Sequence, residues 1–142
     1  METGESWLGM EGLINGHPYL IRIRETMQSF INAKRYNHRF DIVWKYTAVD
    51  ETMMPQAAQM LQMEEAEQDL LGVLEKDEQA MLTMVYLGNN QKVLYWYSSN
   101  LEETAKRINA VLQSTPELPV EIFASEDAEW KQYKTVLPSS SR

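Results

Sequence analysis

The chain has 142 residues, of which 44% are apolar and 24% are charged, and its formal net charge at pH 7 is −8. This length fits a single domain with its own hydrophobic core, which we expect to span residues 1–138, followed by a disordered tail at 139–142. Since the chain contains no cysteine, a disulfide framework, a thiolate zinc site, an iron–sulfur cluster and a cysteine nucleophile are all excluded.

An N-terminal hairpin is the first predicted element. A turn at Asn15–Pro18 separates Ser6–Ile14 from Tyr19–Arg24, and its Asn-Gly start is typical of a hairpin because both residues tolerate positive φ. Residues 25–39 are polar and lack a clean period, which predicts a connection with at most one helical turn. Large apolar side chains then alternate along Phe40–Thr47, which predicts a strand.

A long helix is predicted over Thr52–Lys76, which is rich in Ala, Met, Leu, Gln and Glu and has Pro55 near its start. Helical spacing puts five apolar residues on one stripe: Met60, Met63, Leu70, Leu71 and Leu74. Glu65 and Asp69 fall on the opposite side. Glu67, however, falls within the apolar stripe, so the sequence predicts a carboxylate that faces the core.

A second hairpin is predicted from Ala80–Leu87 and Lys92–Ser98, which are rich in β-forming residues and flank the turn formers at 88–91. Asn100 is the predicted cap of a second helix, with Glu103 in the capping-box position. This helix is expected to end before two prolines and to bury one stripe of side chains; the prolines are Pro116 and Pro119, and the stripe is Leu101, Ala105, Ile108 and Leu112.

The last predicted elements are a strand at Val120–Ser125 and a helical turn that packs Trp130 and Tyr133 against the body. The element order is therefore β-β followed by β-α-β-β-α-β. This order predicts an α+β fold with a ferredoxin-like antiparallel sheet, two main helices on one face and an extra N-terminal hairpin.

Three segments carry a resemblance to a known family: Arg39–Tyr46, Met63–Leu70 and Asp127–Tyr133, the last with Asp-x-x-Trp-x-x-Tyr spacing. They are similar to the bacterial domain-of-unknown-function family 695, and the resemblance runs from about Tyr19 to Pro138. It implies a small bacterial domain, sometimes joined to a domain like the regulator that inhibits ribonuclease E. The resemblance supplies no catalytic residues that could be assigned to positions of this chain.

Most of the negative charge lies in one part of the chain. Residues 51–80 hold eight acidic residues and Lys76 as the only base, so they carry −7 of the net −8. Such a field repels nucleic acid and anionic membranes and attracts basic protein surfaces. The alternative is a solvated helix face that keeps the protein soluble.

We therefore expect a non-catalytic acidic protein that binds and inhibits a basic protein partner, as an immunity protein neutralises a bacterial toxin or nuclease. Acidic residues would steer the encounter and aromatic residues would anchor it. The candidate contact residues are Glu64, Glu65, Asp69, Trp96 and Trp130. The alternative is a small enzyme or ligand-binding domain with a pocket near Glu67 and His38.

Glu67 has two interpretations. A carboxylate that faces the core is destabilising unless it is paired or protonated. We expect a buried structural ion pair with an arginine on or beside the first strands, namely Arg22, Arg24 or Arg39. The alternative is a tuned acid that lines a pocket.

Motifs for other chemistry are missing. The six glycines do not form a phosphate-binding loop, and His17 and His38 stand apart without metal-ligand spacing. No serine lies in a nucleophile elbow, and Lys92–Ser98 lacks the pattern of the RNA-recognition motif. We expect no metal, cofactor, nucleic acid or enzymatic activity. A signal peptide is not expected, and the apolar run Met81–Leu87 is too short to span a bilayer, which predicts a cytoplasmic protein.

Overall fold

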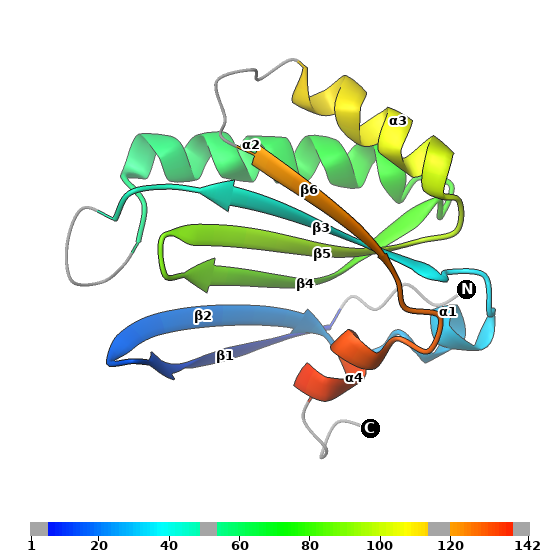
Figure 1. Ribbon diagram of the computed structural model, residues 1–142, viewed down its shortest axis with the longest axis horizontal. Coiled ribbons are helices and arrows are strands. Elements are labelled where there is room, and N and C mark those ends of the chain that lie inside the picture. The colour runs from blue at the N-terminus through cyan, green and yellow to red at the C-terminus, as the bar shows by residue number, and fades with distance from the viewer. Residues whose placement is uncertain (1–5, 49–53, 114–119, 138–142) are drawn as a thin grey trace.

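A computed structural model describes residues 6–48, 54–113 and 120–137. In these residues six strands form one antiparallel sheet with the order β1-β2-β4-β5-β3-β6, so the fold is α+β (Figure 1). The elements are β1 (Trp7–Ile14), β2 (His17–Arg24), α1 (Gln28–Asn32), β3 (His38–Lys45), α2 (Ala57–Leu74), β4 (Ala80–Gly88), β5 (Gln91–Ser98), α3 (Leu101–Leu112), β6 (Val120–Glu126) and α4 (Lys131–Val136).

Both predicted hairpins are present, and each has a tight two-residue turn. Asn15 and Gly16 join β1 to β2 with φ of 52° and 81°, and Asn89 and Asn90 join β4 to β5 with φ of 49° and 62°. Asparagine and glycine tolerate this left-handed conformation, whose twist matches that of the paired strands. The second turn is therefore shorter than the four residues that the sequence predicted.

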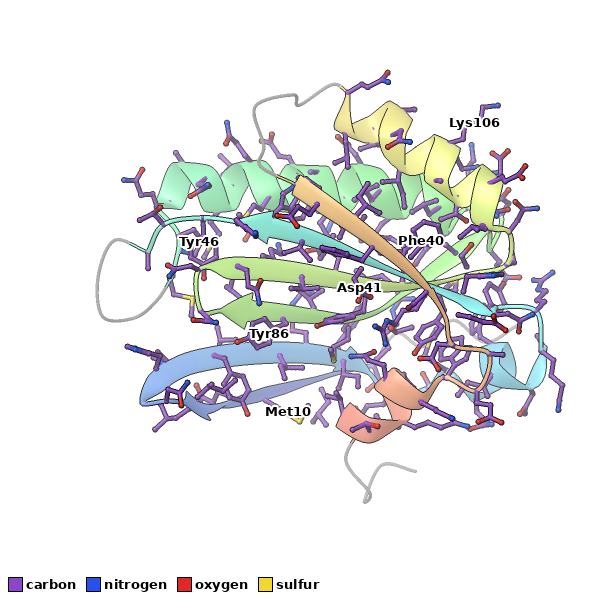
Figure 2. The ribbon with its side chains drawn as sticks, in the orientation of Figure 1. Met10, Phe40, Asp41, Tyr46, Tyr86 and Lys106 are labelled. Atoms are coloured by element: carbon purple, nitrogen blue, oxygen red, sulfur yellow. The ribbon has the colours of Figure 1, made fainter. Side chains whose placement is uncertain are left out.

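Buried side chains form two clusters, because successive residues of a strand point to opposite faces of the sheet. Phe40 and its neighbour Asp41 on β3 illustrate this alternation (Figure 2). The first cluster joins α2 and α3 to the strands and includes Ile42, Trp44, Met63, Leu70, Leu82, Leu94, Trp96 and Ile108. The second joins α1 and α4 to the strands and includes Ile23, Phe30, Tyr36, Met81, Tyr97, Trp130 and Tyr133.

Helix α2 runs along the sheet with α3 beside it (Figure 1). Its buried residues are Met63, Ala66, Glu67, Leu70 and Leu74. The predicted stripe is therefore confirmed at Met63, Leu70 and Leu74, and Glu67 does face inward. Met60 and Leu71 are only partly buried. The predicted start of this helix at Thr52 lies outside the described residues.

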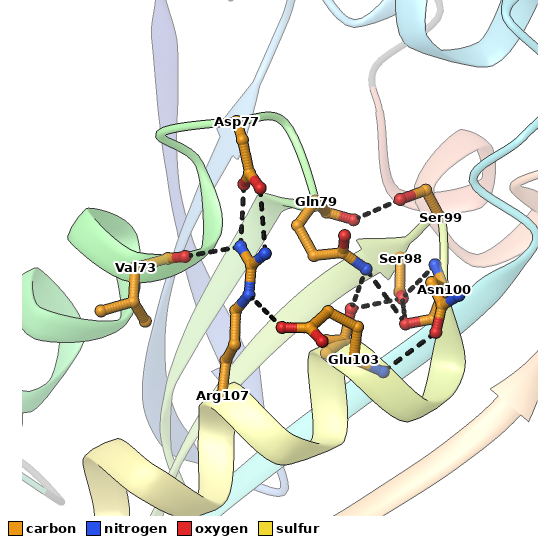
Figure 3. Close-up of polar contacts among 9 residues, drawn as sticks. Val73, Asp77, Gln79, Ser98, Ser99, Asn100, Glu103 and Arg107 are labelled. Carbon is orange, nitrogen blue, oxygen red and sulfur yellow. Dashed lines mark hydrogen bonds and ion pairs between the residues drawn. The ribbon is translucent and has the colours of Figure 1, made fainter.

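The start of α3 is fixed by a polar network (Figure 3). The side chain of Asn100 accepts a hydrogen bond from the N–H of Glu103, which confirms the predicted cap. The Glu103 carboxylate accepts from Arg107 instead of closing a capping box, and Arg107 also donates to both carboxylate oxygens of Asp77. The bonds from Arg107 lower the pKa of Asp77 to about 2. This network holds the end of α2 to α3.

The buried side of α3 differs from the predicted stripe. Ile108 is buried as expected, but Thr104 is the other buried residue, and Leu101 is 39% exposed. Thr104 lies inside because its hydroxyl pairs with that of Ser98 at 2.7 Å and accepts a hydrogen bond from Gln79. Two buried hydroxyl groups satisfy each other, so the polar residue replaces an apolar one at this position.

The segment Asp127–Tyr133 fastens α4 to the sheet. The Asp127 carboxylate accepts hydrogen bonds from the Tyr97 hydroxyl at 2.7 Å and from the N–H of Lys131 at 2.8 Å. Trp130 stacks on Tyr97 with ring centroids 4.0 Å apart and donates from Nε1 to the carbonyl of Tyr36. The Tyr133 hydroxyl donates to the carbonyl of Arg24. The predicted packing of Trp130 and Tyr133 is confirmed.

Some predictions fall on residues outside the described ranges, including the role of Pro116 and Pro119 and the tail at 139–142. Among the helices of the described residues, none has the length and apolar character needed to cross a bilayer.

Candidate functional site

A cavity of about 420 Å³ lies between the first half of α2 and strands β2, β4 and β5. Its apolar wall is formed by Leu20, Pro55, Met60, Met63, Val85 and Leu87. Its polar residues are Arg22, Glu64, Glu67, Gln68 and Lys92. An apolar cavity with a few convergent polar groups is the usual form of a small-molecule site.

Three charged side chains meet at the base of this cavity, and we call them the charged base: Arg22, Glu67 and Lys92. Lys92 Nζ lies 3.0 Å from Glu67 Oε1, and the side chains of the two residues are only 7% and 6% exposed. Arg22 Nη2 lies 3.3 Å from Glu67 Oε1 and 3.2 Å from Oε2, and its side chain is 48% exposed. One carboxylate therefore serves two cations.

Strand periodicity places these residues on one side of the sheet. On β2, Arg22 alternates with Ile21 and Ile23, which contribute to the second buried cluster. On β5, Lys92 shares its face with Leu94 and Trp96 of the first cluster, and its ammonium lies 5.9 Å from the ring centre of Trp44. The two cations thus point toward α2, where helical spacing turns Glu67 inward.

The predicted partner of Glu67 is confirmed for Arg22 only. The other two alternatives have different partners, since Arg24 pairs with Glu75 at 3.0 Å and Arg39 pairs with Asp41 at 2.9 Å. Arg39 lies on the other face of the sheet, where Asp41 is the nearer acid. Lys92 was missed, although its period-2 spacing from Leu94 and Trp96 marks it as an inward-facing lysine.

His38 does not line this cavity, so the predicted pocket near both Glu67 and His38 is corrected. His38 pairs with Ser98 at one end of β3, whereas Trp44 pairs with Lys92 near the other end. Six residues of extended strand separate these positions by roughly 20 Å. The strand register, which the sequence did not specify, decides this.

The predicted partner-contact residues divide into two groups. Glu64, Glu65 and Asp69 are exposed on α2, and none of them forms an ion pair with another described residue. Trp96 and Trp130 are 0% and 1% exposed, so the prediction that they present contact surface was wrong. Trp96 belongs to the first buried cluster and Trp130 to the second.

A second group of titratable residues lies on the opposite face, beside α4. Burial raises the pKa of Asp41 in spite of the neighbouring Arg39. Burial also acts on Asp127, but the Tyr97 hydroxyl and two backbone N–H groups outweigh it and lower the pKa of that carboxyl. Burial together with the bond to Asp127 raises the pKa of Tyr97 well above its ordinary range. These groups bond to one another and to α4, and so connect α4 to the sheet.

No group of three or more His, Asp or Glu side chains within the described ranges is arranged to hold a metal ion.

Comparisons with known proteins place the chain in a family. A search of curated proteins and a search of solved structures each found no match. A family model described as "Family of unknown function (DUF695)" matches residues 5–137, which is nearly the whole chain. The protein belongs to this family.

Proposed function

We propose that this protein is a small-molecule-binding domain whose ligand occupies the cavity between α2 and the sheet. The observation that carries the proposal is the buried Lys92–Glu67 pair of the charged base, at the floor of a cavity of about 420 Å³. Small-molecule sites are concave and lined by apolar side chains with a few precisely placed polar groups, and this cavity has that arrangement.

The proposal is one of binding without catalysis. Both carboxylate oxygens of Glu67 already accept from cations, so this acid is not available to take a proton from a ligand. The apolar wall supplies the contact area, and the charged base sets the orientation of the ligand. The ligand is expected to be amphipathic for this reason.

A fragment screen tests this proposal, with binding monitored through the NMR signals of isotope-labelled methionine methyl groups. Met63 lines the cavity, and Met10 belongs to the opposite face of the sheet. We expect amphipathic fragments to shift the Met63 signal and leave the Met10 signal unchanged. Met60→Trp fills the cavity and should abolish these shifts, whereas the matched control Leu61→Trp changes the next residue, which is 57% exposed, and should retain them.

Two results would contradict the proposal. One is a screen in which no fragment shifts Met63 selectively. The other is fragment binding that Met60→Trp leaves intact, because the ligand would then lie elsewhere on the molecule.

A second candidate is the binding and inhibition of a basic protein, as by an immunity protein that neutralises a toxin. The specific observation in its favour is the exposed side of α2, where Leu61 lies one turn before Glu64 and Glu65. An exposed apolar side chain within an acidic surface suits a basic partner that also buries an apolar residue.

This candidate predicts a partner whose association rate falls with salt and with charge reversal of α2. Capture from native lysate, followed by association kinetics at two salt concentrations, would compare the wild type with Glu65→Lys/Asp69→Lys. Glu102→Lys on α3 is the control, since it changes an exposed acid of another helix. A partner indifferent to the α2 reversals would exclude this mechanism.

We further infer that β3 to β6, with α2 and α3, form a ferredoxin-like unit to which the β1–β2 hairpin is added. The strand order β4-β5-β3-β6 supports this inference, because β5 lies between the two strands that α2 connects. We also propose that the protein acts in the bacterial cytoplasm.

A further inference from the structure

We propose that the ligand of this cavity is a small organic monocarboxylate with an apolar body. This inference rests on the proposed small-molecule function and adds the chemistry of the head group. It follows from the charges at the floor of the cavity, where Arg22 and Lys92 contribute two positive charges and Glu67 contributes one negative charge. At the floor the two cations outnumber the single carboxylate, and the other acid that lines the cavity, Glu64, lies on the exposed side of α2.

The unsatisfied donors belong to the same two cations. The ammonium of Lys92 has three N–H groups, and within the described part of the chain its polar partner is Glu67 alone. Arg22 uses only Nη2 toward Glu67, which leaves Nε and Nη1 of its guanidinium without an acceptor among the described residues. A carboxylate can accept several hydrogen bonds at once. Each of these hydrogen bonds is stronger when its donor is cationic.

Water can solvate the half-exposed Arg22, whereas the buried Lys92 depends on acceptors within the cavity for its remaining hydrogen bonds. Lys92 is 7% exposed, and it lies against the ring of Trp44, so water solvates its ammonium poorly. A neutral ligand would leave the excess charge in place, and a cationic ligand would add to it. An anionic head group removes the imbalance.

The mouth of the cavity limits the ligand to a single negative charge. Glu64 lines the cavity from the exposed side of α2, where a second carboxylate of a ligand would meet a like charge. Met60, Met63 and Leu87 line the rest of the space, which favours an apolar body. A dicarboxylate should therefore bind more weakly than the matching monocarboxylate.

The test compares ligands that share one body. Hydrocinnamate, hydrocinnamamide and phenylpropylamine carry an anionic, a neutral and a cationic head on similar aryl chains, and phenylsuccinate carries two carboxylates. Each would be titrated into the full-length protein and followed by the Met63 methyl signal. We expect hydrocinnamate to bind roughly tenfold or more tightly than the amide, as a charge-assisted bond predicts, and the amine and phenylsuccinate to bind more weakly than hydrocinnamate.

Two variants connect this preference to the charged base. Lys92→Met keeps an unbranched side chain and removes its charge, and Arg22→Gln removes the charge of a half-exposed residue while Lys92 stays paired with Glu67. Either variant should bring the affinity for hydrocinnamate close to that for the amide. Lys106→Gln on α3, outside the cavity, removes a positive charge of the same kind and should leave the preference intact.

The possible failures are distinguishable. If the amide or the amine binds as tightly as hydrocinnamate, the carboxylate inference is wrong and the proposed binding function stands. If the preference survives Arg22→Gln and a folded Lys92→Met, the head group is recognised elsewhere and the inference is also wrong. If none of the compounds shifts Met63 at millimolar concentration, both the inference and the proposed function fail.

Discussion

Glu67 occupies a position where helical periodicity and residue type conflict. Its neighbours on the buried side of α2 are Met63 and Leu70, and its own side chain is only 6% exposed although it carries a charge. The conflict is resolved by two cations from strands that are distant in sequence, Arg22 on β2 and Lys92 on β5. A buried charge is tolerated when its hydrogen-bonding capacity is filled in this way.

Replacing Glu67 with glutamine tests this account at the residue scale. Glu67→Gln removes the charge that both cations share, so Lys92 becomes a buried cation without a counterion. We expect the free energy of unfolding, measured with urea, to fall by about 3 kcal/mol. The control Glu65→Gln lies on the exposed side of α2 and should change stability by less than about 0.5 kcal/mol. Equal stability of Glu67→Gln and wild type would contradict the structural role of the pair.

At the scale of the element, α4 illustrates how a short helix becomes stable. A helix of six residues has too few internal hydrogen bonds to persist by itself. Asp127 accepts from the N–H groups of its first turn, and Trp130 and Tyr133 fasten it to Tyr97 and to the carbonyl of Arg24. The residues that carry the family resemblance at this end of the chain therefore have a packing role.

Removal of the Trp130 ring should loosen α4 and the neighbouring part of the sheet. Trp130→Ala empties a site in the second buried cluster, and we expect a loss of about 4 kcal/mol in the free energy of unfolding. Tyr133→Phe removes only the bond to the carbonyl of Arg24 and should cost about 1 kcal/mol. Hydrogen exchange of α4 measures the local effect. Unchanged protection in Trp130→Ala would show that other contacts hold this helix.

On the scale of the whole molecule, one sheet separates two clusters that both depend on buried tyrosines. Tyr46 belongs to the first cluster, and Tyr97 and Tyr133 belong to the second. Burial raises the pKa of Tyr46 and of Tyr133 from the ordinary value of 10.0 to about 12, and raises that of Tyr97 further. The folded state thus keeps these hydroxyl groups protonated where the unfolded chain would ionise them.

The protein should consequently lose stability in alkaline solution. A raised folded-state pKa stabilises fully below the unfolded value near 10, and this contribution is lost as the pH rises through about 12. We expect the urea midpoint to fall steadily over this range, and Tyr46→Phe should lose less than the wild type. Tyrosine ionisation, followed by ultraviolet absorbance, should coincide with unfolding. Ionisation of all seven tyrosines without loss of structure would contradict this prediction.

The sequence by itself determined the local elements and the family. Asn-Gly and Asn-Asn turns, period-2 strands, the Asn100 cap and the inward position of Glu67 are all properties of residues close together in the chain, so local patterns predict them. The tertiary structure alone decided which strands are neighbours. Strand order brought Arg24 to Glu75 and Lys92 to Glu67, placed His38 away from the cavity, and buried Trp96. These contacts join residues far apart in sequence, and periodicity specifies a face of the sheet but not the partner that lies across it.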